Sequence, residues 1–473
     1  MDSKKFRVEA DSIGDIEIPV DAYYGVNAMR ASQNFHITGQ EMNKQLIIGL
    51  AEVKKACAIS NYEAGIMEED VKDAISKASD EIMEGKLHDQ FIVDPIQGGA
   101  GTSANMNANE VIANRANEIL GGELGTYDKV HPNDHVNMGQ STNDSFPTGA
   151  KIAALKLGSK TVEEFKELKD TLLEKAKEFD AVIKMGRTHL QDAVPIRMGQ
   201  EFHGYSSVIG RDIKRIQEAL DALKVVNMGA SAVGTGINVD TEYLEVIVPN
   251  LNKINDLGLV QTDDLVDGTN NLDGFVFLSS ALKTAAVNLS KMANDMRLMA
   301  SGPRCGFAEL HLPEKQAGSS IMPGKINPVI AEVMSQVAFN VIGNDTAVTM
   351  AAEAGQLQLN VFEPVLLYNL YESIETLGNG VATFRDNLIV DATANIERCK
   401  ELVEGAVGTI TAIVPHVGYK NAAKVAKVAI ETGEPVRELV LKEKLLTEAE
   451  LDEILDPFAM TEPGIAAKHL LDE

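Results

Sequence analysis

Apolar residues recur three and four positions apart along most of this chain, which is the spacing of amphipathic α-helices. The most regular run follows a repeating 4-3 spacing through Leu278, Leu282, Ala285, Leu289, Met292, Met296 and Met299. That spacing is typical of the seam between packed helices, so it predicts one long helix here. Residues 151–179 and 329–350 carry similarly long patterns. Because each long helix must bury its apolar faces, often against another chain, the pattern predicts a central bundle of long helices.

The N-terminal part of the chain has a different pattern. Residues 7–25 are rich in β-branched side chains, and Gly14-Asp15 can turn a hairpin between them. We therefore expect a small β-hairpin before the helices begin. Helical spacing then covers residues 43–59, 69–85 and 103–120.

After about residue 396 the helical segments become short. Residues 420–432 and 447–455 are bounded by Gly-Glu-Pro and Asp-Pro turns, and Thr447 with Glu450 fits a capping box. This change predicts a small C-terminal helical domain. We expect a mainly α protein with an N-terminal domain, a central bundle domain and a C-terminal domain, at residues 1–141, 142–396 and 397–473.

Composition narrows the classes of partner. The 473 residues include 70 Asp and Glu against 43 Lys and Arg, so the formal net charge is −27. A surface of this sign repels nucleic acid and anionic membranes, and we expect neither as a partner. The same charge means that a site for an anion must carry its own local positive field. The low aromatic content of 5% fits helix better than sheet.

The cysteines and the N-terminus indicate the compartment. Cys57, Cys305 and Cys399 are far apart, form neither a CxxC pair nor a zinc pattern, and are odd in number. Residues 1–7 contain no apolar signal core, and no stretch reaches the ~18 apolar residues that a membrane span requires. We expect a cytoplasmic protein.

The densest chemistry lies in residues 318–328, which read GSSIMPGKINP. The segment combines two hydroxyls, a lysine and an amide, and it leads into a predicted helix whose N-terminus attracts anions. It is not a Walker A loop, because five residues separate Gly318 from Gly324 and no hydroxyl residue follows the lysine. The segment is either a carboxylate-binding loop or an ordinary surface loop.

Three further polar clusters lie far from this loop in the sequence. Residues 98–105 form a glycine-rich loop with neutral donors. Residues 137–144 hold more hydroxyl and amide side chains than one helix cap needs, and Asp144 is the expected cap. Residues 186–192 include His189, a side chain that can bind or move a proton near neutral pH. Each cluster also has a structural interpretation, as a polar turn, a capped helix start or a packed histidine.

Other catalytic patterns are missing from the sequence. There is no GxSxG elbow, no HExxH and no GxGxxG after a strand. His131 and His135 are four residues apart, but the Pro-Asn between them argues against a metal-binding helix face, and we expect no metal site. Glu332 follows the 318–328 loop by one helical turn, where it could orient a histidine or face solvent.

Together and in this order, the clusters resemble the aspartase/fumarase superfamily. The GSSIMPGKINP loop is similar to the superfamily signature, and the resemblance runs from about Phe6 to the C-terminal domain. Residues 141–144, Val194 and residues 351–360 resemble aspartases more closely than class II fumarases. The resemblance implies a three-domain α-helical fold and a homotetramer whose active sites are shared between subunits.

The resemblance also implies an ammonia-lyase that converts L-aspartate reversibly to fumarate and ammonia. The catalytic residues would be Ser319 as general base, Lys325 and His189. The substrate β-carboxylate would be held by Thr102, Ser141, Thr142 and Ser320. The α-carboxylate would be held by Lys325 and Asn327. The amino group would contact Asn143, Thr188 and His189.

This chemistry makes physical sense. Removing a proton beside the β-carboxylate creates an aci-carboxylate with a second negative charge, and donors aimed at that charge lower the barrier. The ammonium group leaves as neutral ammonia, so no strong acid is needed at that end of the substrate. The resemblance implies that no organic cofactor is required. The alternatives are a class II fumarase-type hydro-lyase acting on malate and fumarate, and a catalytically silent structural protein on the same fold.

Overall fold

The computed structural model describes residues 6–471. The N-terminal segment in which we found no signal core is residues 1–7, and residues 1–5 of it lie outside the described part of the chain. The described chain is mainly helical, with strands only in short two-stranded pairs, which confirms the mainly α prediction. None of the helices between residues 6 and 471 has the length and apolarity needed to cross a membrane. The chain forms two compact units. The first combines the described residues up to Glu163 with Asp212–Ala286 and Val337–Asn379, and the second contains Glu164–Arg211, Val287–Gln336 and the residues from Gly380 onward.

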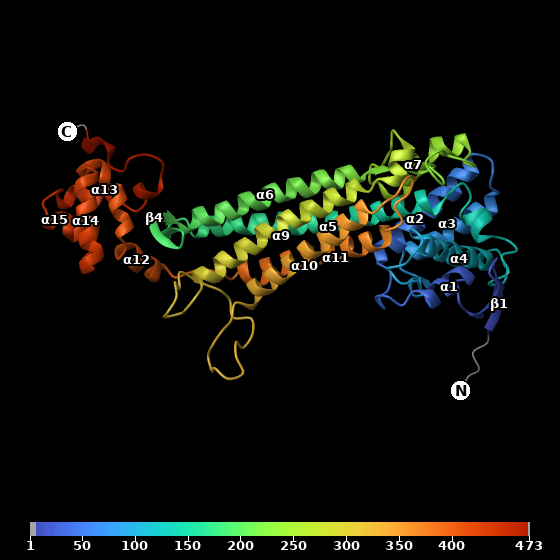
Figure 1. The fold of residues 1–473 in the computed structure, drawn as a ribbon, viewed down its shortest axis with the longest axis horizontal. Helices are drawn as coiled ribbons and strands as arrows, with labels where there is room; N and C mark the ends of the chain where they lie inside the picture. Colours follow the sequence, from blue (N-terminus) through green and yellow to red (C-terminus); the bar gives the residue numbers. More distant parts are fainter. Residues whose placement is uncertain (1–5, 472–473) are drawn as a thin grey trace. The chain divides into compact units, whose positions relative to one another are not determined.

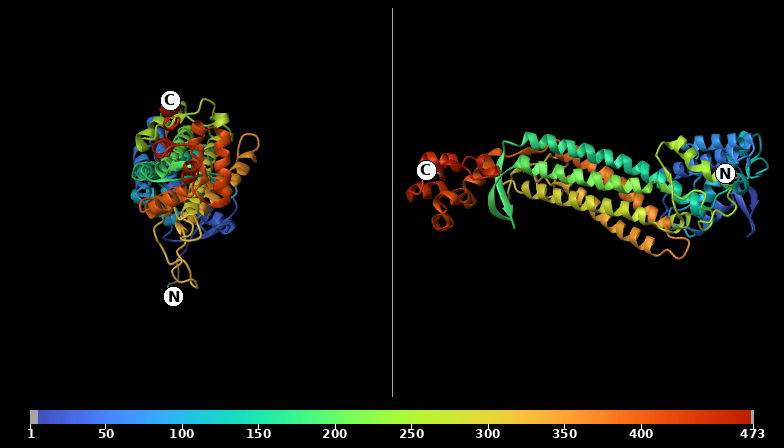
Figure 2. Two further views of the ribbon diagram at one scale, coloured as in Figure 1. Left: turned by 90° about the vertical axis from the view of Figure 1, so that its left-hand side faces the viewer. Right: turned by 90° about the horizontal axis from the view of Figure 1, so that it is seen from above.

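The long helices contribute segments to both units. They are α5 (Thr142–Glu178), α6 (Met198–Leu223), α9 (Asp273–Met299), α10 (Val329–Glu353) and α11 (Glu363–Phe384). Within each unit the segments of these helices lie side by side (Figure 1 and Figure 2). Every residue of the predicted seam on α9 is buried. The bundle of long helices is therefore confirmed.

The first unit also holds the N-terminal elements. They are β1 (Phe6–Ala10), β2 (Asp15–Pro19), α1 (Val26–Asn34), α2 (Lys44–Glu63), α3 (Glu69–Met83), η1 (His88–Gln90), α4 (Thr102–Ile119), η2 (Pro132–Val136), β5 (Val225–Val226), α7 (Thr241–Asn255), β6 (Val260–Gln261) and α8 (Leu265–Asn270). The helix α2 packs against α3, α4 and α7, so it is buried on nearly every side (Figure 1).

The predicted hairpin is present but shorter than expected. β1 and β2 pair antiparallel, with Phe6 opposite Pro19. The pairing ends at Pro19 rather than continuing to residue 25. The reason is Arg7, whose guanidinium donates to the carbonyls of Pro19, Ala22 and Tyr24 and ties the chain into a turn.

The second unit ends in a group of short helices. Its remaining elements are β3 (Ile183–Thr188), β4 (Gln191–Arg197), β7 (Leu310–His311), η3 (Arg385–Ile389), β8 (Thr393–Ala394), α12 (Ile396–Glu404), η4 (Val407–Thr409), α13 (Ile410–Val417), α14 (Tyr419–Thr432), α15 (Val436–Lys442), α16 (Glu448–Ile454), η5 (Ala459–Thr461) and η6 (Lys468–Leu471). The helices α13–α16, red in Figure 2, share a small apolar core. Thr447 and Glu450 form the predicted capping box. The proposed boundaries at residues 141 and 396 fall at the starts of α5 and α12, and the three-domain division stays a prediction.

Candidate active site

The first polar cluster is a loop that turns into α4. Gly101 precedes the helix with φ of 88°, and a side chain there would meet the Phe146 ring at 2.4 Å, so only glycine fits. Thr102 is the first helical residue and is exposed, and its hydroxyl donates to the Gly99 carbonyl at 2.7 Å. This hydroxyl therefore lies at a helix N-terminus, where the dipole favours an anion.

The second cluster, at the start of α5, lies against the first. Asn105 follows Thr102 by one turn on α4, and its Nδ2 donates to Thr142 Oγ1 at 3.1 Å. Both Asn105 and Thr142 are buried. Since Thr142 Oγ1 accepts this bond, its own hydroxyl proton remains available for a ligand. The fold of the first unit thus brings Thr102 and the 141–143 segment together.

Ser141 caps α5, which corrects our assignment of Asp144 as the cap. Ser141 Oγ accepts from the Asn143 N–H at 3.2 Å, and the Ser141 N–H donates to Asp144 Oδ1 at 2.9 Å. The two side chains form a reciprocal cap of the capping-box kind. The other Asp144 oxygen accepts from the N–H groups of Gly229 and Ser231, at 3.2 and 3.1 Å. Asp144 therefore reaches two backbone segments at once, and burial raises its pKa to about 6.

Asn143 is held by a loop that our sequence reasoning missed. Pro147 has no N–H, so the Asn143 carbonyl lacks its usual helical partner, and Asn227 Nδ2 donates to that carbonyl at 3.0 Å. Asn143 Nδ2 in turn donates to the Ala232 carbonyl at 2.7 Å. The Asn143 Oδ1 atom is left as an acceptor suited to an ammonium group. Three closely spaced glycines within residues 227–237 were the signal that could have found this loop.

The third cluster is the tip of the β3–β4 hairpin in the second unit. His189 and Leu190 connect the strands with φ of 56° and 58°. Non-glycine residues seldom adopt such angles, and each costs about 1 kcal/mol or more. Thr188, His189 and Leu190 are all exposed. A strained and exposed tip of this kind is typical of a segment that serves a ligand rather than the core.

A buried charge network anchors the base of the same hairpin. The fully buried Glu309 accepts from Arg187 Nη1 at 2.9 and 3.1 Å, and its carboxylate lies 3.4 Å from Lys184 Nζ. Lys184 also pairs with Glu201 at 3.1 Å. Glu309 leads through β7 toward the 318–328 loop, so the network ties together the segments that carry the third and fourth clusters. Our sequence reasoning missed Lys184 and Glu309, because residues far apart in the sequence form their pairing.

The fourth cluster lies between β7 and α10, in a segment without regular secondary structure. Ser319 Oγ accepts from the backbone N–H groups of Ile321 at 3.2 Å and Met322 at 2.9 Å. Hydrogen bonds to a charged form favour that form, so these donors stabilise an alkoxide on Ser319. Ser319 is half-buried, whereas the neighbouring Ser320 is exposed.

Gly318 and Asn327 close the base of this loop. A side chain on Gly318 would meet the Lys325 carbonyl oxygen at 2.0 Å, so the two ends of the loop touch where only glycine allows it. Asn327 Nδ2 donates to the Gly318 carbonyl. One N–H of Asn327 thus holds the loop together, and the other remains available for a ligand.

Lys325 presents a cation without an ionic partner. It is exposed, and within residues 6–471 no carboxylate oxygen lies within 4.0 Å of its Nζ. Lys325, Asn327 and Glu332 line a cavity of about 690 Å³ in the second unit. Glu332 Oε1 lies 3.8 Å from Arg297 Nη2, so this carboxylate pairs with an arginine rather than a histidine in the chain. An unpaired lysine beside a cavity suits an anionic ligand.

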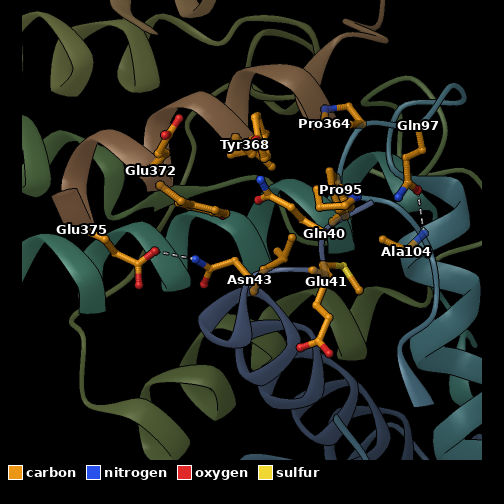
Figure 3. A pocket seen from close by; sticks show the side chains of 15 residues that line it. Gln40, Glu41, Asn43, Pro95, Gln97, Ala104, Pro364, Tyr368, Glu372 and Glu375 are labelled. Atoms are coloured by element: carbon orange, nitrogen blue, oxygen red, sulfur yellow. Dashed lines mark hydrogen bonds between the residues drawn. The ribbon is translucent and has the colours of Figure 1, made fainter. Parts of the chain in front are cut away.

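A smaller cavity of about 180 Å³ lies beside the first cluster in the first unit (Figure 3). Its lining includes Gln97, which accepts from the Ala104 N–H at 2.8 Å, and Asn43, which donates to Glu375 at 2.9 Å. None of the residues predicted for the site lines it. The polar clusters, and not this cavity, define the candidate site.

The two units divide the predicted residues. The first unit holds Thr102, Ser141, Thr142 and Asn143. The second holds Thr188, His189, Ser319, Ser320, Lys325, Asn327 and Glu332. Within the described chain, no hydrogen bond or ion pair joins Thr188 or His189 to Ser319 or Lys325.

Comparison with known proteins connects these clusters to a family. The family model described as Lyase matches residues 14–343, and the model described as Fumarase C C-terminus matches residues 410–462. The chain is 55% identical to aspartate ammonia-lyase of Bacillus subtilis over 99% of each chain. It is 46% identical to aspartate ammonia-lyase of Escherichia coli, over 100% of this chain and 99% of the relative.

Solved structures agree with these matches. A fumarate lyase:delta crystallin from Brucella melitensis bound to cobalt has a TM-score of 0.95 and 45% identity, covering 97% of this chain and 100% of that one. A class II fumarase from Schistosoma mansoni has a TM-score of 0.93 but only 35% identity, with the same coverage. The identity to the aspartate ammonia-lyases is thus higher than the identity to this fumarase.

The chain belongs to the lyase family that these models describe, and its fold is the one that fumarases share. Within that family its place is among the aspartate ammonia-lyases, which makes it a carbon–nitrogen lyase. The resemblance inferred from the sequence is confirmed.

Proposed function

We propose that this protein removes ammonia from L-aspartate by general-base catalysis, with Ser319 as the base. The observation that carries the proposal is the Ser319 hydroxyl, whose oxygen accepts two backbone N–H groups on a loop that also bears the unpaired Lys325. Serine is a poor base in water, and donors together with a nearby cation favour its alkoxide.

The reaction proceeds in two steps. The Ser319 alkoxide takes a proton from the carbon beside the β-carboxylate, and the electron pair of the C–H bond moves into that carboxylate to form an aci-carboxylate. The pair then returns to form the carbon–carbon double bond as the C–N bond breaks, and its electrons leave with neutral ammonia. Fumarate remains, and Ser319 releases its proton to solvent.

The polar clusters divide the substrate between them. The β-carboxylate, where charge develops, is bound by the hydroxyls of Thr102, Ser141, Thr142 and Ser320. The α-carboxylate is bound by Lys325 and Asn327. The amino group contacts Asn143, Thr188 and His189, and Glu332 acts as a supporting residue outside the substrate's immediate contacts. His189 joins Ser319 and Lys325 in the catalytic centre.

Each active site is shared between subunits of a homotetramer in this proposal. The polar clusters at residues 98–105, 137–144, 186–192 and 318–327 lie far apart in the sequence, and several of them abut long helices, which favours contributions from more than one chain. Symmetric packing of the long helices would bring them together.

The cytoplasm is the proposed location of the reaction. All three cysteines are free, and Cys57 and Cys399 are buried as thiols. Free thiols fit a reducing compartment.

One assay tests the reaction assigned. The purified protein is supplied separately with L-aspartate, L-malate and argininosuccinate, and fumarate formation is followed. We expect fumarate from L-aspartate only. Fumarate from malate would indicate a fumarase, and none from any substrate would indicate a silent protein on the same fold.

Lys325→Ala is expected to raise KM for L-aspartate and to lower kcat by about 10²-fold, because the lysine acts on a bound carboxylate and on the nearby oxyanion. Lys325→Arg should restore activity only in part, since a planar guanidinium differs from a point charge. Steady-state kinetics of both variants check this. The matched control is Lys427→Ala, which removes one exposed lysine from α14. Full activity in the arginine variant would contradict the expected geometry.

The 318–328 loop is expected to close over the substrate. The side chain of Ile321 is 83% exposed, so few apolar contacts fix the loop in its present position. Trypsin should cut after Lys325 in the free protein. Succinate at 100 times its Kd should slow this cut by roughly 100-fold, because cleavage requires the ligand-free form. Cleavage after Lys444, an exposed residue in the turn that follows α15, is the internal control. Equal rates at Lys325 with and without succinate would argue against closure.

A further inference from the structure

A lysine is buried beneath the start of α5 without an ionic partner. Lys54 lies on α2 and has no exposed surface. Its Nζ donates to Gln140 Oε1 at 2.7 Å and to Asn137 Oδ1 at 3.1 Å, and both acceptors are neutral amides. Across the part of the chain that the structure describes, no carboxylate oxygen lies within 4.0 Å of it. Burying an unpaired charge costs free energy, so a fold that retains one needs a compensating interaction.

A chain of amides leads from this lysine to Thr142. Asn137 Oδ1 accepts from Asn105 Nδ2 at 3.2 Å and from Asn109 Nδ2 at 3.1 Å as well as from Lys54. The same Asn105 Nδ2 donates to Thr142 Oγ1 at 3.1 Å. Because an ammonium group can only donate, Lys54 holds the Asn137 oxygen toward the donors together with Asn109 Nδ2, and Asn105 then offers its other N–H to Thr142. The Thr142 hydroxyl, already an acceptor, is left to donate outward.

We propose that Lys54 is a positioning residue for the substrate, which orients the Asn137–Asn105–Thr142 chain so that Thr142 donates to the substrate β-carboxylate, and whose buried charge attracts that carboxylate. The inference rests on the proposed function, in which Thr142 binds this group. It also accounts for a dianion site in a protein of net charge −27, because a charge in a low-dielectric interior acts more strongly than one in water.

Lys54 titrates within a convenient pH range. Burial lowers its pKa to about 8, against the opposing effects of Cys57 on α2 and Asp144 on α5. Burial raises the pKa of Cys57 to about 12 and raises that of Tyr243 on α7, whose hydroxyl lies 3.2 Å from the thiol. The pKa of Asp144 is about 6, and α4 and residues 137–140 present neutral amides. Lys54 therefore loses its charge as pH rises through 8, and dicarboxylate affinity should fall with it.

The experiment measures succinate binding to the full-length protein by calorimetry, from about pH 6.5 to about pH 9.5. Lys54→Met removes the charge and the donors, whereas Lys54→Gln removes the charge and keeps a donor. Both variants should lose at least ~10-fold in affinity at neutral pH, and both should lose the fall above pH 8. Their melting temperatures should stay within a few degrees of the parent, because the cost of burying the charge is removed as well. A purely structural lysine would instead change stability and leave the pH profile unchanged.

The outcomes separate this inference from the proposed function. If Thr142→Val binds succinate as tightly as the parent, Thr142 is not part of a carboxylate site and the proposed function loses that contact. If Thr142→Val loses affinity while Lys54→Gln stays within twofold of the parent, the inference about Lys54 alone is wrong. If neither Lys54 variant folds, the pH dependence of succinate binding to the parent protein is the test. A succinate affinity that does not fall between about pH 7 and about pH 9 overturns the inference.

Discussion

Replacing Ser319 with alanine is expected to lower kcat for L-aspartate deamination at least ~10²-fold, the smallest loss typical of a positioned general base. The fold should be unaffected. Ser319 is half-buried, and its only described hydrogen bonds are from the Ile321 and Met322 N–H groups, which water can satisfy in the variant. Fumarate formation measures the forward rate. The kcat/KM for amination of fumarate should fall by the same factor as the kcat/KM for deamination, because a variant cannot change the equilibrium constant.

The neighbouring serine provides the matched control. Ser320→Ala removes a hydroxyl from the same exposed loop, but in our proposal this hydroxyl binds the β-carboxylate and takes no proton. We expect it to raise KM more than it lowers kcat. Near-normal turnover in a folded Ser319→Ala protein would remove Ser319 from the role of base, whatever the Ser320 variant does.

Mixing two inactive variants is expected to restore activity. In the proposed homotetramer, a Ser319→Ala protein and a Thr142→Ala protein, unfolded together and refolded, would form mixed tetramers if chains assort at random. Where one chain supplies Ser319 and another supplies Thr142, roughly a quarter of the sites receive both intact residues. The mixture should therefore regain about a quarter of the parent activity from two inactive proteins, measured as fumarate formation after refolding.

A second pair of variants tests whether the regained activity comes from active sites that are shared between chains. Ser141 and Thr142 are adjacent, so one chain always supplies both to a given site, and a mixture of Ser141→Ala with Thr142→Ala should stay inactive. Each parent taken through the same refolding should also stay inactive. If the Ser319 and Thr142 mixture remains inactive while mixed tetramers form, both residues come from one chain and the shared-site model is wrong.

The sequence was most informative where local patterns decide structure. The seam from Leu278 to Met299 predicted α9, because a 4-3 spacing of apolar residues can bury itself only as a helix. The Thr447–Glu450 capping box was also correct, since its hydrogen bonds lie within one helical turn. Asp144 was assigned wrongly as the cap because its main partners lie far from it in the sequence. Its second oxygen binds Gly229 and Ser231, which no local pattern could associate with it.

By itself, the sequence determined the class of fold, the family and the four polar clusters, because helical periodicity and short motifs depend on residues close together in the chain. The tertiary structure alone decided how those clusters are supported. It placed Asn227 on the carbonyl that Pro147 leaves free, Glu309 beneath the hairpin of His189, and the buried Lys54 against Asn137 and Gln140. These contacts join segments far apart in the sequence, so no local pattern could reveal them. Their contribution to stability depends on burial, because burial raises the free-energy cost of an unpaired charge and strengthens each hydrogen bond.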